Sequence, residues 1–204
     1  MLRPMKASCR RNRPAEFRIP PVSEFRLAEA ARCLRRGGVV AYPTEGVYGL
    51  GCDPLNAAAV TQVLRLKRRP AAKGFVLIAA DWGQIEPYLD LPDPGLRDRL
   101  QAAWPGPITF VVPVAEWVPV WLRGEQSGLA VRITAHPVAA ALCRWFGRPL
   151  LSTSANRTGQ PPARTALAVR RRFPPGELIL VPGRVGGLAG PTPIHDALSG
   201  RRLR

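Results

Sequence analysis

Small polar side chains occur in this sequence at a spacing that suits ligand binding. In the stretch 150–162, LLSTSANRTGQPP, the residues Ser152, Ser154 and Asn156 alternate along the chain. In an extended segment their side chains therefore share one face, where hydroxyl, amide and main-chain N–H groups could meet a ligand. The same residue types also form simple turns, so this stretch alone does not establish a site.

Three cations follow a helical pattern and precede an apolar run. Lys67, Arg69 and Lys73 lie between AAAVTQVLRLKRR and GFVLIAA. Cations at a helix C-terminus interact favourably with the helix dipole, which is one explanation for them. The other is a phosphate-binding cluster, in which Arg69 would give a bidentate grip and the lysines would act as point charges.

A third candidate segment is YPTEGVYGLG. Pro43, Thr44 and Glu45 follow a short apolar run, and three glycines occur within the next six residues. Glycine allows the backbone conformations and close approaches that a loop needs around a ligand. The pattern predicts a Gly-rich, ligand-facing loop over residues 44–54, although a plain strand-to-loop corner would look the same.

Common catalytic signatures are absent. The sequence has no GxxxxGK[ST] phosphate loop, and Gly49-Leu50-Gly51 continues as Cys-Asp-Pro, so a GxGxxG dinucleotide motif fails. It also lacks a GxSxG elbow and an SxxK pair, which argues against a covalent serine mechanism. A nucleophilic cysteine–histidine pair using Cys52 or Cys143 has no local support. A hydrolase acting through Ser154 stays a formal alternative.

The composition indicates an intracellular protein with an anionic partner. Thirty Lys and Arg residues oppose fourteen Asp and Glu, giving a formal charge of +16 that suits nucleic acid, nucleotide phosphates or an acidic surface. The four cysteines form no CxxC pair, and two histidines are too few for a His-rich zinc centre. No apolar run approaches the roughly 18 residues of a membrane span. We therefore expect a cytoplasmic protein in which the Asn156-Arg157-Thr158 sequon is accidental.

Periodicity predicts one α/β domain. Residues 1–20 are Pro- and Arg-rich and are expected to form a mobile basic arm, and residues 21–204 to form the domain. Apolar spacing predicts a helix over 24–36 that buries Phe25, Ala28, Leu34 and either Ala31 or Arg32. A second helix, capped by Asn56 and ended by Pro70, should bury Val60, Val63, Leu64 and Ala57.

The remaining elements follow the same reading. Two short helices are expected between residues 80 and 104, and a hairpin around Ser199-Gly200. Helices are predicted over 136–147 and, capped by Thr165, over 166–173. Strands are predicted over 39–43, 74–80, 128–133, 148–152 and 177–182. One more strand is predicted within 104–114, after the turn at the start of that segment. Strands separated by helices, with a few hairpin-like joins, favour a mixed sheet.

Taken in order, five blocks resemble one family. They are GGVVAYPTEGVYGLGCDP, LKRRPAAKGFVLIAA, WPGPITFVVP, LAVRITAHP and LLSTSANRTGQPP. The set resembles the YrdC-like threonylcarbamoyl-AMP synthases from about residue 22 to residue 200. The Lys-x-Arg and Ser-x-Asn pairs in this order are the specific part. We expect no counterpart here of the additional C-terminal domain of longer members.

The resemblance implies a fold and a reaction. The fold would be a single YrdC-like α/β domain with an open, twisted mixed sheet, flanking helices and a concave basic face. The enzyme would convert ATP, L-threonine and bicarbonate or CO2 to threonylcarbamoyl-AMP and pyrophosphate. That product supplies the N6-threonylcarbamoyl group of adenosine 37 in tRNAs that read ANN codons. The implied partners are tRNA or double-stranded RNA and the threonylcarbamoyl transferase machinery.

The resemblance also implies residue roles. Lys67 and Arg69 would be the catalytic cations at the ATP phosphates, and Lys73 would add electrostatic attraction for phosphate or RNA. Ser152, Ser154 and Asn156 would bind the nucleotide, with Thr109 nearby. Thr44 would hold L-threonine, and Arg132 would bind its carboxylate. Mg²⁺ would be held by the triphosphate and water rather than by protein ligands.

Two segments depart from the family pattern. Lys73-Gly74-Phe75 replaces a segment that in many relatives contains Asn-Pro-Leu or histidine, and TPIHD replaces a Ser-Thr-Ile-x-Asp pattern. We assign no role to His195. The competing functional hypothesis is a non-catalytic double-stranded RNA- or tRNA-binding protein that uses the same basic face. Charge favours that alternative, but charge alone does not require the Thr-Glu and Ser-x-Ser-x-Asn segments.

Overall fold

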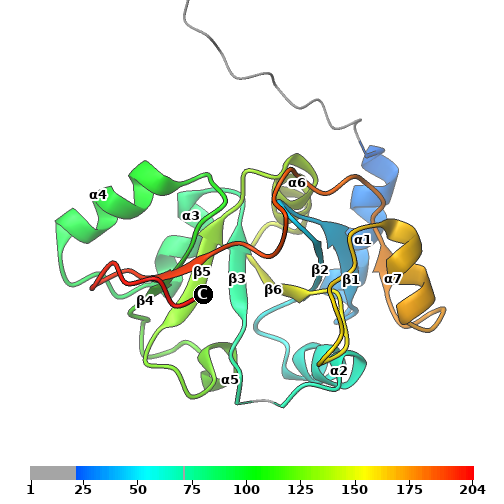
Figure 1. The fold of residues 1–204 in the computed structure, drawn as a ribbon, viewed down its shortest axis with the longest axis horizontal. Helices are drawn as coiled ribbons and strands as arrows, with labels where there is room; N and C mark the ends of the chain where they lie inside the picture. The colour runs from blue at the N-terminus through cyan, green and yellow to red at the C-terminus, as the bar shows by residue number, and fades with distance from the viewer. Residues whose placement is uncertain (1–21, 71) are drawn as a thin grey trace, which may run out of the picture.

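The protein is built on one eight-stranded mixed sheet (Figure 1). The structure is a computed structural model that describes residues 22–70 and 72–204, so the predicted basic arm lies outside the described residues. The strands are β1 (Val40–Pro43), β2 (Tyr48–Cys52), β3 (Val76–Ala79), β4 (Thr109–Val112), β5 (Leu129–Ile133), β6 (Leu150–Ser154), β7 (Ile179–Leu180) and β8 (Ile194–Asp196). The single α/β domain expected from the sequence is confirmed.

The helices lie on both faces of this sheet. They are α1 (Glu24–Arg35), α2 (Ala57–Lys67), α3 (Trp82–Ile85), the 3-10 helix η1 (Glu86–Tyr88), α4 (Pro94–Ala103), α5 (Val120–Arg123), α6 (Pro137–Phe146) and α7 (Ala166–Arg172). None of the described helices is long and apolar enough to cross a membrane.

Strand order across the sheet is β7-β1-β2-β6-β3-β5-β4-β8. β1 and β2 pair antiparallel, and β6 inserts antiparallel between β2 and β3. The pairs β1–β7, β3–β5 and β4–β8 are parallel. In this order the start of β2 lies beside the end of β6, and the starts of β3 and β5 follow next in the sheet, although these segments are far apart in the sequence.

Alternation along each strand divides the core into two layers. Tyr42, Ile78 and Leu150 point to one face and pack against α1 and α6, while Leu77 and Leu151 point to the other face and join the larger core. On the first face, α1 and α6 pack over β1, β7 and the parts of β3 and β6 that carry Ile78 and Leu150. The uncovered part of that face is where the predicted site residues lie.

Local signals at helix ends are confirmed. Asn56 caps α2 by accepting from the N–H of Ala59, and Thr165 caps α7 by accepting from the N–H of Ala168. Gly147 ends α6 in the left-handed conformation that glycine adopts at little cost. The C-terminal hairpin also forms, with main-chain hydrogen bonds joining β8 to residues 201–204.

The prediction of a Gly-rich loop over 44–54 is wrong for residues 48–52, which form β2, whereas residues 44–47 form a turn that contributes Thr44 and Val47 to the cavity described below. The sequence signal misled since glycine usually weakens a strand. Here two of its glycines make room for a neighbouring ring: a Cβ on Gly51 would lie 2.8 Å from Cε1 of Tyr42. The conformational freedom of Gly49 and Gly51 is not what selects them; their lack of a side chain is.

Other details of the predicted elements are corrected. Phe25 is exposed, and α1 buries Leu27, Ala30, Ala31 and Leu34 instead. Ala57 is exposed and Leu64 only half-buried, because Ala59 and Leu66 complete the buried stripe of α2. That helix ends at Lys67, where Arg68 turns left-handed, two residues before Pro70. The predicted strand over 177–182 shortens to β7, since only two residues pair with β1.

Candidate functional site

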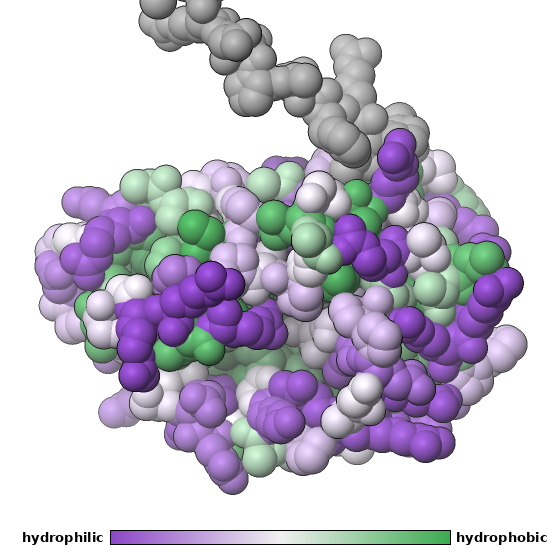
Figure 2. Space-filling model, viewed as in Figure 1, coloured by the Kyte–Doolittle hydropathy of each residue, from purple (hydrophilic) through white to green (hydrophobic). Residues whose placement is uncertain are grey.

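A cavity of about 350 Å³ opens on the uncovered face of the sheet. Figure 2 shows hydrophilic residues gathered around a hollow on this side of the molecule. Five cations line the cavity, and no Asp or Glu side chain does among the described residues. The lining cations are Arg69, Lys73, Arg123, Arg132 and Arg204. Its volume lies in the usual range for small-molecule sites.

One side of the cavity is a strand wall, made of Gly49 on β2 and Ser152 and Ser154 on β6. Register places Gly49 opposite Ser154, and the two serines share a face as their alternation predicted. Ser154 Oγ donates to Oδ1 of Asn156 at 2.6 Å, and the Asn156 amide donates to Gln160 O at 2.7 Å. Asn156 is therefore beside the cavity, but it orients Ser154 rather than lining the space itself.

Lys67 lies behind this wall and not in the cavity lining. Its side chain is 2% exposed, and its ammonium donates to Ser154 O, to Asn156 O at 2.9 Å and to Asn156 Oδ1 at 3.4 Å. Burial lowers the pKa of Lys67 to about 7, and the charge of Arg69 acts in the same direction. Contact with a phosphate would require the ammonium to leave these three oxygens.

The opposite side is a cationic rim, made of Arg69, Lys73, Arg123 and Arg204. Arg69 donates through Nη2 to Lys73 O and, at 2.7 Å, to Gly74 O, and it lies 5.5 Å over the Phe75 ring. These contacts fix its guanidinium without a carboxylate partner. Burial lowers the pKa of Arg69, with repulsion from Arg204 as a further cause.

Two glycines allow the segment that carries Lys73 and the segment that carries Arg123 to approach each other. A Cβ on Gly74 would lie 2.3 Å from Arg123 O, and one on Gly124 would lie 2.4 Å from Ala72 O. The N–H of Phe75 donates to Leu122 O at 2.8 Å across the same junction. This close backbone contact explains why the Lys73-Gly74-Phe75 segment, which departs from the family pattern, carries glycine at its centre.

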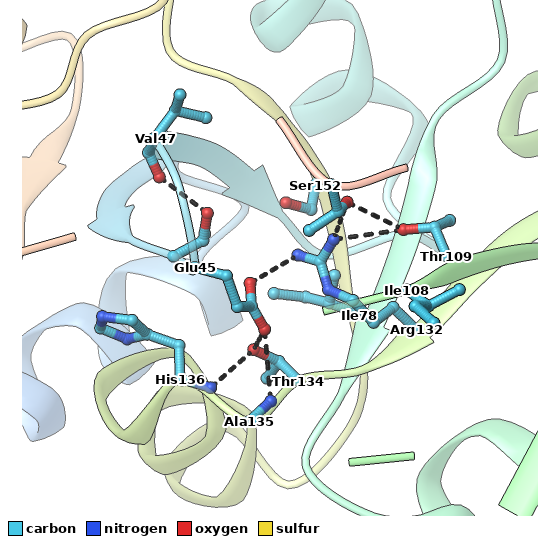
Figure 3. A network of polar contacts seen from close by, with 12 residues as sticks. Glu45, Val47, Ile78, Ile108, Thr109, Arg132, Thr134, Ala135, His136 and Ser152 are labelled. Atoms are coloured by element: carbon cyan, nitrogen blue, oxygen red, sulfur yellow. Dashed lines mark hydrogen bonds and ion pairs between the residues drawn. The ribbon is translucent and has the colours of Figure 1, made fainter. Parts of the chain in front are cut away.

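Arg132 belongs to a buried network beneath the cavity (Figure 3). Its Nη2 lies 3.2 Å from Oε2 of Glu45, and its Nη1 donates to the hydroxyls of Thr109 and Thr192. Oε1 of Glu45 accepts from the Thr134 hydroxyl at 2.6 Å. The predicted threonine-binding arginine thus reaches the cavity as half of an ion pair. Thr109 is fully buried and acts through Arg132 rather than lining the space.

Thr44 lines the cavity beside this network. Its hydroxyl donates to Val47 O at 2.7 Å, so toward a ligand it can only accept a hydrogen bond. The glycine-rich segment 183–192 is held over the Thr44 loop: Gly186 N donates to Thr44 O and Leu188 N to Glu45 O. A Cβ on Gly46 would lie 1.9 Å from Gly190 O, so this contact requires glycine.

Arg204 and Thr192 are site residues that the sequence reasoning missed. The C-terminal hairpin crosses the face of the sheet from β8 (Figure 1), and Arg204 donates to Thr192 O at 2.9 Å. Asp196 shapes the hairpin by accepting from the N–H groups of Leu198 and Ser199. The available signal was the cluster of arginines at 201–204. His195 bonds within this hairpin and does not line the cavity.

No nucleophile–base pair is present in the described part of the chain. Cys52 and Cys143 are fully buried, and burial raises the pKa of each thiol, to about 12 for Cys143. His136 bonds to Arg184 O rather than to a thiol. The Ser154 hydroxyl donates to Asn156 Oδ1, and Lys67 bonds to the main-chain oxygen of Ser154 rather than to its hydroxyl. The described residues also hold no group of three His, Cys, Asp or Glu that could bind a metal ion.

Comparison with known proteins places the chain in a family. The family model Sua5_yciO_yrdC, described as telomere recombination, matches residues 32–201. The chain belongs to this family. It is 54% identical over 183 residues to the threonylcarbamoyl-AMP synthase of Methylococcus capsulatus, covering 90% of this chain and 98% of that protein. It is 53% identical to the enzyme of that name from Nitrosococcus oceani, over 88% and 97% of the two chains.

Solved structures agree with this assignment. P. abyssi Sua5 complexed with L-threonine superposes with a TM-score of 0.78 at 32% identity, and E. coli YciO with 0.73 at 28%. The match covers 86% of this chain and 52% of the Sua5 chain, so the chain spans about half of that protein; for YciO the shares are 83% and 82%. The expected fold and the expectation of a nucleotidyltransferase-type enzyme of this family are confirmed.

Proposed function

We propose that the chain is an L-threonylcarbamoyladenylate synthase, which converts ATP, L-threonine and bicarbonate or CO2 to threonylcarbamoyl-AMP and pyrophosphate. The threonine amine and CO2 form a carbamate, and a carbamate oxygen attacks the α-phosphorus of ATP. Pyrophosphate leaves with the electrons of the broken P–O bond. The names of the Methylococcus and Nitrosococcus relatives support this reaction.

The observation that carries the proposal is a cavity with five lining cations, several hydroxyls and no lining Asp or Glu side chain among the described residues. In-line attack at phosphorus needs substrates held in position and negative charge stabilised, and it needs no protein nucleophile. A site that is rich in cations but lacks a nucleophile–base pair suits that chemistry. It does not suit a hydrolase acting through Ser154.

In this proposal the cationic rim receives the triphosphate. Arg69 and Arg204, whose guanidinium groups are hydrogen-bonded to main-chain carbonyls, are donors that suit phosphate oxygens, and Lys73 and Arg123 also line the cavity and add charge. Ser152 and Ser154 bind the nucleotide from the strand wall. Asn156 and Lys67 act on it through the position of Ser154.

L-Threonine would bind beside Thr44 and Arg132. The Thr44 hydroxyl oxygen can accept from the threonine amine or hydroxyl, and Arg132 can share its guanidinium with the substrate carboxylate. The L-threonine complex of P. abyssi Sua5 supports a threonine site in this fold. Because the cavity lining lacks Asp and Glu side chains, the described side chains form no cage for Mg²⁺. A magnesium ion would enter on the triphosphate and keep phosphate and water ligands.

The product is unstable in water, so a consumer must follow. We propose that threonylcarbamoyl-AMP passes to the threonylcarbamoyl transferase machinery for adenosine 37 of tRNAs that read ANN codons, in the cytoplasm. The formal charge of +16 supports contact with tRNA or double-stranded RNA. Lys73, which is exposed on the rim, is a candidate for that contact as well.

Pyrophosphate release from ATP tests the function. We expect release only when L-threonine and bicarbonate are both present, and none when either is omitted. Release that ignores threonine would indicate a different nucleotide reaction. No release, combined with tight and steeply salt-dependent RNA binding, would favour the non-catalytic RNA-binding alternative. A covalent serine adduct would favour the hydrolase.

A further inference from the structure

The ring of Tyr42 crosses one strand to reach the next. Tyr42 on β1 pairs in register with Gly49 on β2, and Gly51 of β2 pairs with Ser152 on β6. The Tyr42 hydroxyl donates to Ser152 Oγ at 2.8 Å. The ring passes over β2 where both glycines lack side chains: a Cβ on Gly49 would lie 3.3 Å from Tyr42 Cζ.

This hydrogen bond fixes which way each hydroxyl points. Tyr42 is fully buried, and Ser152 Oγ is its single hydrogen-bond partner among the described residues. If the phenol accepted this bond instead, its own hydrogen would be buried without an acceptor, which is unfavourable. Burial also raises the pKa of Tyr42, so the phenol keeps the proton that it donates.

The consequence concerns Ser152. A hydroxyl has one hydrogen to donate, and the Ser152 oxygen already accepts from Tyr42. Ser152 donates to no other group in the described chain, and its side chain lines the cavity. Its hydrogen is therefore left for a ligand that offers an acceptor.

We propose that Tyr42 is a positioning residue that makes the Ser152 hydroxyl a hydrogen-bond donor toward an oxygen of ATP in the cavity. The proposal rests on the proposed function, because it takes ATP as the ligand. Tyr42 itself touches no substrate. Tyr42 should therefore affect ATP affinity only when Ser152 is present, and an experiment can detect this dependence.

The experiment is a double-mutant cycle on ATP affinity, measured by titration calorimetry on the full chain. Ser152→Ala removes the donor and should weaken ATP binding about tenfold, the lower end of the loss expected for one hydrogen bond to a charged group. Tyr42→Phe keeps the ring and removes only the hydroxyl, and it should weaken binding about threefold to tenfold. In the Ser152→Ala background, Tyr42→Phe should cost no further affinity.

Tyr48→Phe is the matched control. It also removes a buried tyrosine hydroxyl, but that hydroxyl bonds to Gly183 O and N rather than to a cavity side chain. Whatever factor Tyr48→Phe costs should be the same with and without Ser152. Thermal unfolding of every variant shows which of them are folded, and Tyr42→Phe retains the ring that fills the slot over β2.

The outcomes separate the two claims. Tyr42→Phe with unchanged ATP affinity, or with the same loss in both backgrounds, overturns the positioning role. The predicted coupling without threonine- and bicarbonate-dependent pyrophosphate release supports the positioning role and contradicts the proposed function. A wild-type protein that does not bind ATP contradicts both.

Discussion

On the strand wall, polar side chains bond to one another, whereas on the cationic rim guanidinium groups bond to main-chain carbonyls. Tyr42 donates to Ser152, and Ser154 donates to Asn156. Arg69, Arg123 and Arg204 instead hold the carbonyls of Gly74, Gln126 and Thr192. None of these three arginines forms an ion pair within the described residues.

The difference separates two ways of preparing a site. A carbonyl orients a guanidinium without neutralising it, so the rim keeps its full charge for a phosphate ligand. Hydroxyl chains add no charge but fix the direction in which each hydrogen points. The affinity of the cationic rim for a phosphate ligand should therefore fall as the salt concentration rises. The contribution of the strand wall should depend instead on how well the ligand's acceptors match the directions of its hydroxyl hydrogens. Arg132 is the exception, because Glu45 neutralises it beneath the cavity.

The largest expected effect comes from breaking that exceptional pair. Arg132→Met leaves the buried Glu45 carboxylate with hydrogen bonds but no cation. Removing one partner of a buried pair costs about 3–5 kcal/mol, so urea unfolding should show a loss of that size in the free energy of unfolding. Arg26→Met, which breaks the exposed Arg26–Glu29 pair, should change it by about 1 kcal/mol or less. Equal losses in both variants would contradict a structural role for Arg132.

The next effect tests the rim. Arg69→Met should weaken ATP binding by about 10- to 100-fold, because hydrogen bonds to charged groups contribute about 1.5–3 kcal/mol. It should also reduce the salt dependence of binding. Arg68→Met is the matched control, since Arg68 is exposed one residue earlier and does not line the cavity. Similar losses in both variants would show that general charge, and not the rim, attracts ATP.

The last effect is a pH dependence that belongs to Lys67. Its folded-state pKa of about 7 is below the ordinary value of 10.5, so between these values the unfolded chain holds a proton that the folded chain lacks. The Lys67 contribution to unfolding free energy should therefore rise from pH 7 to pH 9, by up to about 1.4 kcal/mol per unit. Lys67→Met should remove this rise, while Lys73→Met, which alters an exposed lysine, should keep it. Identical slopes in wild type and Lys67→Met would contradict the assignment.

Features that depend on neighbouring residues in the chain were predictable from the sequence, whereas features that depend on contacts between distant segments were not. Caps such as Asn56 and the alternation of Ser152 and Ser154 are local patterns, and both are confirmed. The strand β2 was predicted to be a loop because of its glycines. Those glycines make room for the ring of Tyr42 on β1, and the sequence of β2 alone does not reveal that contact.

The remaining misses at the site have the same cause. The inward turn of Lys67 depends on carbonyls 87 and 89 residues away, and Arg204 reaches the cavity through the pairing of β4 with β8. Charge type and spacing identified Lys67 and Arg69 as a pair, yet only tertiary contacts show that Lys67 is buried behind the strand wall while the half-buried Arg69 lines the cavity. The residue types at the site were thus predictable from the sequence, whereas the different roles of neighbouring residues were not.

The most direct test of the central claim is the mass of the nucleotide product formed from ATP, L-threonine and ¹³C-labelled bicarbonate. We expect a threonylcarbamoyl adenylate that carries the label in its carbamoyl carbon, formed in step with pyrophosphate. An unlabelled threonyl adenylate, or AMP alone at the same rate of pyrophosphate release, would show that no carbamate attacks ATP in this cavity.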